Sequence, residues 1–301
     1  MTRINSEKIP YYSLYEKAVL IRKFENRLLD LFSEGKLFGT THTYVGQEAT
    51  AVSLISQLCK YDVVFSNHRC HGHYLVKNDD PEGLLAEIMG KQSGICCGRG
   101  GSQHLCRNNF FSNGIQGGYL PNALGMAFAE KYNNSNAIVV AFIGDGTLGE
   151  GSVYETLNLA SLLQVPLLIV IENNKYAQTT PIEKNLAGSI VKRVEAFDIN
   201  ATEVESNDVS VLYPLFTNAI KNVRNDRASS VVIVNSYRLN AHSKGDDFRD
   251  PDEIKRWREK DPLNYFTSVL SDKDRTDIEK KVASRIHIIE EKVERASFAS
   301  F

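Results

Sequence analysis

The chain has 301 residues, of which 42% are hydrophobic and 24% are charged, the composition of a globular protein that can bury a sizeable core. Its 35 basic residues stand against 37 acidic ones, and the formal net charge of −2 removes the usual electrostatic case for binding nucleic acid. No apolar run approaches the roughly 20 residues that a membrane-spanning helix needs, so we expect no membrane partner.

The N-terminal residues and the cysteines predict a cytoplasmic protein. Residues 1–8 have neither the apolar core of a signal peptide nor the composition of a transit segment. The five cysteines are odd in number, which argues against a disulfide framework. Several lie near histidines, but the adjacent Cys96 and Cys97 cannot easily turn both sulfur atoms to one ion. We therefore expect plain thiols here and no zinc site.

The hydrophobic pattern predicts helices first and then a sheet. Residues 14–32 have helical spacing with Gly35 as a stop, and a second helix is expected over about 47–59. Continuous apolar runs, typical of strands covered on both faces, occupy residues 63–65, 137–143, 167–171 and 231–237. Helices are expected between them, at about 119–132, 151–163 and 209–224. This alternation predicts a parallel α/β sheet.

We divide the chain into three segments on this pattern. Residues 1–60 form an N-terminal helical segment, and residues 61–240 form the α/β domain. Residues 241–301 contain an exposed polar loop, at 241–252, and C-terminal helices that pack on the same domain. The last helix, over about 276–295, has one apolar face that is expected to pack against the sheet or a partner subunit.

Polar residues follow two of the predicted strands. Asp145 comes directly after 137–143, Asn174 comes after 167–171, and the helix between them completes a βαβ unit. If the strands are neighbours, they lie about 4.8 Å apart, and the two side-chain oxygens can meet on one hard cation. Gly144 and Gly146 let the backbone approach closely, and the following helix N-terminus favours an anion. Each motif alone is usually a turn or a strand cap. Together they predict a Mg²⁺-diphosphate site.

These residues also carry a family resemblance. Gly144-Asp145-Gly146, a gap of 26 residues and Asn173-Asn174 resemble the thiamine-diphosphate fingerprint. The flanking motifs resemble the α subunit of the decarboxylating component of 2-oxo acid dehydrogenases, the family that acts on pyruvate, acetoin or branched-chain substrates. These motifs lie at residues 21–25, 46–49, 68–72, 98–104, 237–238 and 241–243. The resemblance implies a thiamine-diphosphate-binding fold with helices on both faces of a mainly parallel sheet. Residues 61–240 are then the diphosphate- and Mg²⁺-binding domain.

The resemblance also implies roles for individual residues. Mg²⁺ is expected on Asp145, Asn174 and the backbone carbonyl of Tyr176. The diphosphate is expected on Arg69, whose guanidinium can make paired hydrogen bonds, and on Gly146 with Thr147. Backbone atoms of Gly114 and Gln116 are expected to meet the aminopyrimidine. The complete set implied for the cofactor is His68, Arg69, Gly114, Gln116, Gly144, Asp145, Gly146, Thr147, Asn174, Tyr176 and His242.

Two histidines are candidates for catalysis. His242 matches the histidine of the family's active-site loop and is expected to touch the diphosphate and the reacting groups, although an isolated histidine in a polar loop is often simply solvated. His71 is a candidate for substrate contact because it is close in sequence to Arg69. His42 and His104 are equally compatible with structural roles. His68 stands where relatives usually have tyrosine.

The resemblance implies partners as well. In this family, a glutamate on a separate pyrimidine-binding domain activates the cofactor, and 301 residues leave no room for that domain. We therefore expect a β subunit, in an α2β2 assembly, and a lipoyl-bearing acyltransferase as acyl acceptor. The expected reaction is decarboxylation of a 2-oxo acid, or cleavage of acetoin, followed by acyl transfer.

Two alternatives stay open at this point. Residues 150–155 also resemble a transketolase, so the chain can be read as the N-terminal half of a split transketolase or acyloin-forming enzyme. A degenerate, non-enzymatic cofactor domain is the other. Every expected ligand of Mg²⁺ and diphosphate is present, which speaks against it.

Overall fold

The computed structural model describes residues 9–37, 39–243, 245 and 247–300. Residues 1–8, on which the cytoplasmic prediction partly rests, lie outside the described residues, as do positions 244 and 246 of the predicted loop. The strands of the main sheet are β1 (Val63–Ser66), β2 (Cys106–Arg107), β3 (Phe110–Ser112), β4 (Val139–Gly144), β5 (Leu167–Asn173), β8 (Asn200–Glu205) and β9 (Ser230–Asn235).

The sheet has the order β2-β3-β1-β4-β5-β9-β8, and every neighbouring pair is parallel except β2 with β3. The predicted parallel α/β fold is therefore confirmed, with the four apolar runs at its centre. A separate hairpin joins β6 (Tyr176–Ala177) to β7 (Thr180–Pro181). It directly follows β5, so it places Tyr176 beside the carboxyl ends of β4 and β5.

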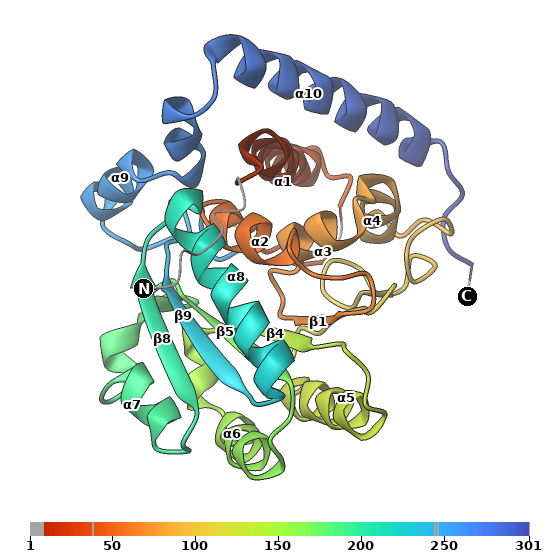
Figure 1. Cartoon of the computed structure of the whole chain (residues 1–301). Helices are drawn as coiled ribbons and strands as arrows, with labels where there is room; N and C mark the ends of the chain where they lie inside the picture. The colour runs from red at the N-terminus through yellow and green to blue at the C-terminus, as the bar shows by residue number, and fades with distance from the viewer. Residues whose placement is uncertain (1–8, 38, 244, 246, 301) are drawn as a thin grey trace.

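Helices cover both faces of the sheet (Figure 1). One face carries α5 (Leu120–Tyr132), α6 (Gly151–Leu163) and α7 (Ile190–Glu195). The other carries α1 (Tyr11–Ser33), α2 (Glu48–Ile55), α3 (His71–Asn78), α4 (Pro81–Ile88) and α8 (Val209–Asp226). Alternate residues of each central strand pack into the two hydrophobic cores. This burial on both faces explains why the strands read as continuous apolar runs.

The C-terminal segment contains α9 (Pro251–Glu259) and α10 (Asp272–Glu294). The α10 helix lies along α1 in Figure 1, and Arg27 of α1 donates to Glu290 of α10 at 2.7 Å. The expected apolar face is confirmed, but it packs on the helical layer instead of directly on the sheet. No helix in the described part of the chain has the length and apolar character that a membrane crossing requires.

Several elements were not predicted. Helices α3, α4 and α7 are short, with six to eight residues each. The edge strands β2 and β8 are mostly exposed and polar, so they have no apolar run. The second helix ends at Ile55 instead of residue 59, and α10 begins at Asp272, where the Ser271 side chain caps it. The division into three segments stays a prediction. Residues of all three segments contribute to one hydrophobic core.

Gly72 in α3 offers a test of this packing. A Cβ atom there would lie 2.3 Å from Cδ1 of Tyr44, which is fully buried. We expect Gly72→Ala to lower the free energy of unfolding by about 1–3 kcal/mol through overpacking. Urea denaturation measures this value. The matched control is Gly125→Ala in the exposed middle of α5, where a Cβ meets nothing within 4 Å. Because alanine is the better helix former, this control should be neutral or stabilising. Equal losses in both variants would contradict the packing argument.

Candidate functional site

The site lies at the carboxyl ends of β4 and β5. These strands are parallel neighbours with Gly144 opposite Glu172, so Asp145 and Asn174 come to the same edge of the sheet, as predicted. A cavity of about 360 Å³ opens there. All eleven residues of the predicted cofactor set line this cavity. It is lined in addition by His42, Gln103, Glu150, Ala177 and Gln178.

The Asp145 carboxylate is buried in the wall of the cavity. The residue is 1% exposed, and its Oδ2 atom has no hydrogen-bond partner among the described residues. Burial raises the pKa of this carboxyl from 3.8 to about 6. A buried carboxylate oxygen without a donor is costly, and a bound cation would satisfy it.

Asn174 and Tyr176 form one turn beside Asp145. The Oδ1 atom of Asn174 accepts a hydrogen bond from the backbone nitrogen of Tyr176 at 3.2 Å. This turn links the end of β5 to the β6–β7 hairpin. The oxygen ligands predicted for Mg²⁺ therefore come from two adjacent strand ends and one tight turn, which is a compact arrangement for a hard cation.

Two buried arginines lie next to the cavity. Arg69 is 3% exposed and donates to the Thr43 carbonyl at 2.9 Å, and Arg238 is 2% exposed and donates to the Gln178 carbonyl at 2.9 Å. Within the described ranges neither forms an ion pair with a carboxylate, and Nε of Arg238 has no partner. Burial lowers the pKa of both guanidinium groups, to about 10 for Arg238. Two buried cations that form no ion pair with any described carboxylate favour an anionic ligand.

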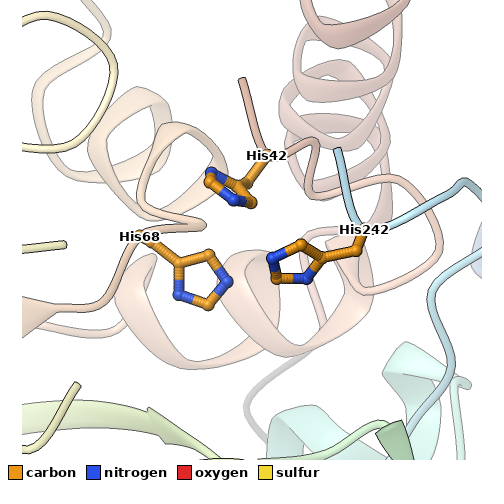
Figure 2. Close-up of side chains that lie close together, drawn as sticks. All are labelled: His42, His68 and His242. Atoms are coloured by element: carbon orange, nitrogen blue, oxygen red, sulfur yellow. The ribbon is translucent and has the colours of Figure 1, made fainter. Parts of the chain in front are cut away.

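Three imidazole rings meet at the cavity: His42, His68 and His242 (Figure 2). One ring nitrogen from each lies within 4.8 Å of the others, so the cluster has the composition of a metal site. The rings come from three distant parts of the chain, and the ring centroids of His42 and His242 are 4.6 Å apart. Sequence reasoning included His68 and His242 in the cofactor set and left His42 open, because it was equally compatible with a structural role.

The hydrogen bonds of His68 and His242 indicate that these two rings present N–H donors and not metal-binding nitrogen atoms. Arg69 can only donate, so Nδ1 of His242, 2.9 Å from its Nη2 atom, accepts. The amide nitrogen of Gln116 donates to Nδ1 of His68 at 2.8 Å, and its orientation is fixed by a second bond to the Gly114 carbonyl. A neutral imidazole that accepts at Nδ1 carries its proton on Nε2. Burial and the Arg69 charge lower the pKa of His68, so it stays neutral.

His71 does not line the cavity. It is fully buried, with Nδ1 3.1 Å from Oε2 of Glu25 and Nε2 2.8 Å from the hydroxyl of Ser102. The same glutamate accepts from the backbone nitrogen of Tyr44 at 2.8 Å. His71, at the start of α3, thus connects this helix to Glu25 of α1 and to Ser102 in the loop after Gly101. His104 is exposed and also lies outside the lining.

Two glycines permit close approaches around the cavity. A Cβ on Gly146 would lie 2.7 Å from Cβ of Ala177 in β6, and one on Gly114 would lie 2.2 Å from Oε1 of Gln103. At Gly144 a Cβ would meet nothing within 4 Å. Gly146 is therefore required for the contact between the turn after β4 and the β6–β7 hairpin, whereas the end of the Gln103 side chain could move away from a Cβ at Gly114.

Comparison with known proteins gives a consistent result. The model of the dehydrogenase E1 component family matches residues 16–300. The α subunit of acetoin:2,6-dichlorophenolindophenol oxidoreductase from Bacillus subtilis (strain 168) is 36% identical over 284 residues, covering 91% of this chain and 85% of that protein. The α subunit of the pyruvate dehydrogenase E1 component from Rickettsia bellii is 33% identical, covering 95% and 91%. Its counterpart from Zymomonas mobilis is 36% identical, covering 89% and 78%.

Proposed function

Because the chain belongs to the dehydrogenase E1 component family, whose members are thiamine-diphosphate-dependent oxidoreductases that act on 2-oxo acids, we propose that its cavity binds the cofactor together with Mg²⁺ and works with a β subunit. One observation carries the metal proposal: Oδ2 of Asp145 is buried and has no partner in the described part of the chain. Bound thiamine diphosphate supplies carbanion chemistry at the substrate carbonyl.

We propose that Asp145, the side-chain oxygen of Asn174 and the backbone carbonyl of Tyr176 hold Mg²⁺. A cation that keeps few protein ligands leaves room for phosphate oxygens. Arg69 and the region of Gly146 and Thr147 then hold the diphosphate. The burial of two arginines that form no ion pair among the described residues supports this assignment, because an anion offsets their desolvation.

The remaining polar residues receive supporting roles. We propose that His68 and His242 donate Nε2–H to oxygen atoms of the cofactor or substrate, and that the backbone of Gly114 and Gln116 meets the aminopyrimidine. Because His71 is buried between Glu25 and Ser102, we propose that it positions the loop that contains Ser102 and does not contact substrate. His242 remains the candidate for a catalytic residue.

A partner is the second part of the proposal. The relatives are named as α subunits, which supports a β subunit that completes the cofactor site, in an α2β2 assembly, and a lipoyl-bearing acyltransferase as acceptor. Exposed apolar side chains occur along α5 and α6 and at residue 115, and exposed apolar surface is typical of interfaces. They are Ile115, Phe128, Tyr132, Leu159 and Leu162. The five unpaired cysteines support a reduced, cytoplasmic setting.

The test combines binding with turnover. The chain is co-expressed with the β subunit of its own organism, and calorimetry measures binding of thiamine diphosphate with and without Mg²⁺. An assay with an artificial electron acceptor then compares pyruvate, branched-chain 2-oxo acids and acetoin. We expect Mg²⁺-dependent binding and oxidation of at least one of these compounds. Absence of both would overturn the proposal. Ketol transfer without oxidation would favour the transketolase alternative, which the reported relatives do not support.

A further inference from the structure

A second cavity lies at the opposite edge of the sheet from the cofactor cavity. It is a groove of about 710 Å³, a volume within the range of small-molecule sites. The ends of α2 and α3 and the turn between β2 and β3 line it, together with Cys59 and Lys60, which precede the amino end of β1. The cofactor cavity lies at the carboxyl ends of the strands, and the two cavities share no lining residue.

Three lysines line this groove, and no acidic residue among the described ones does so. Lys17 comes from α1, Lys60 precedes β1, and Lys77 lies in the last turn of α3. Nζ of Lys17 donates to the Ser56 hydroxyl at 2.9 Å, and Nζ of Lys77 donates to two backbone carbonyls, at 3.2 and 2.8 Å. Burial lowers the pKa of both Lys17 and Lys77, because their charged forms lose hydration.

The negative groups near these lysines do not balance their charge. Asp62 and Asp79 act on the lysines from outside the groove. Each already forms an ion pair at 2.7 Å, Asp62 with Arg224 and Asp79 with Arg285. The C-termini of α2 and α3 add about half a negative charge each, against three full positive charges. The groove therefore has an excess of positive charge, which an anion would offset.

An amide donor in the same groove also lacks an acceptor. Asn78, the last residue of α3, lines the groove, and its Nδ2 atom is buried with no hydrogen-bond partner in the described part of the chain. A buried donor without an acceptor is costly, and an oxygen atom of a ligand would satisfy it. The groove has an apolar part as well, formed by Ile55, Leu58 and Val76. This combination fits an organic molecule that carries an anionic group.

We propose that the groove binds a small organic phosphate. Lysine ammonium groups act as point charges toward phosphate, whereas arginine is the residue suited to planar, paired contacts. The phosphate oxygens accept from Lys17, Lys60 and the Asn78 amide, and the organic part packs on the apolar residues. The proposal is independent of the proposed function, because the groove and the cofactor cavity have no residue in common.

Nuclear magnetic resonance of the isolated full chain, without cofactor, tests this proposal. The probes are inorganic phosphate and AMP, and adenosine is the control ligand without the anionic group. Titrations follow the backbone amide signals of residues 76–78 and give dissociation constants. Lys17→Met removes one charge and keeps an apolar side chain, and Asn78→Asp replaces the amide donor by a carboxylate of similar size. The control variant is Lys192→Met, which changes an exposed lysine of α7 on the other face of the sheet.

We expect both phosphate and AMP to shift these signals in the wild type, with tighter binding of AMP because its organic part adds apolar contact. Lys17→Met should weaken AMP binding about 10-fold, as for the loss of one hydrogen bond to a charged group. Asn78→Asp should weaken it further, because its carboxylate repels the phosphate. Lys192→Met should bind like the wild type, and adenosine should bind much more weakly than AMP.

The variant Arg69→Met distinguishes the groove from the cofactor cavity. Binding that persists in Arg69→Met and weakens in Lys17→Met supports the groove. Loss of binding in Arg69→Met alone would place the anion in the cofactor cavity and overturn the proposal. Equal dissociation constants in the wild type, Lys17→Met and Asn78→Asp, or no shift with either probe, would overturn it too. Urea denaturation shows whether each variant is folded, and the exposed Lys60→Met replaces Lys17→Met if the latter is not.

Discussion

Replacing Asp145 by asparagine is expected to abolish Mg²⁺-dependent binding of thiamine diphosphate and to stabilise the cofactor-free chain. The first effect follows because the neutral amide cannot supply the anionic oxygen that a hard cation prefers. We expect the affinity to fall by at least about 100-fold, as for the loss of a charge-assisted contact. Activity of the complex should fall with it.

The second effect follows from the burial of Asp145. Its pKa is about 6 in the folded chain, compared with an ordinary value of 3.8. One pKa unit is about 1.4 kcal/mol, so ionisation in the folded state costs the chain about 3 kcal/mol at most. The raised pKa means that this cost is absent below pH 4, develops between pH 4 and about 6, and is complete above that range. An asparagine avoids it.

Chemical denaturation without cofactor at pH 5 and pH 8 measures the effect. We expect Asp145→Asn to exceed the wild type in free energy of unfolding at pH 8, and by less at pH 5. The control is Asp277→Asn, an exposed aspartate on α10, which should show no such difference. A less stable Asp145→Asn chain at pH 8 would show that the carboxylate is structural.

Replacing Arg69 by methionine is expected to cause the other large loss. Arg69 is buried beside the cavity and has no carboxylate partner among the described residues. Its natural counter-ion in our proposal is the diphosphate, so the variant should bind thiamine diphosphate at least about 100-fold more weakly. Arg69→Lys keeps the charge but loses the planar fork, and we expect an intermediate affinity.

The cofactor-free stability of Arg69→Met should change little. The variant loses the hydrogen bonds to the Thr43 carbonyl and to His242. It also removes a buried charge that has no ion-pair partner among the described residues, so we expect a difference within about 2 kcal/mol.

Thiamine without phosphate serves as the control ligand for Arg69→Met. Calorimetry should show the loss for thiamine diphosphate and for inorganic pyrophosphate, but not for thiamine. An equal loss for all three ligands would mean that the cavity has collapsed, and the assignment of Arg69 to the diphosphate would fail.

The sequence by itself determined the centre of this molecule. A strand buried on both faces is apolar throughout, so β1, β4, β5 and β9 correspond to continuous apolar runs in the sequence. A βαβ unit places consecutive strand ends at one edge of the sheet, so the sequence alone predicts that Asp145 and Asn174 lie close together. The eleven residues implied for the cofactor all line one cavity, whereas the candidate His71 does not.

Only the tertiary structure decided the contacts between distant segments. Arg69 and His242 are 173 positions apart, and no local spacing reports their hydrogen bond or the proton position that it imposes. The joining of His42 to this cluster and the burial of His71 against Glu25 have the same origin. The hydrophobic periodicity of a segment indicates which of its faces is buried. Which distant residue a side chain meets across the cavity depends on how the whole chain packs.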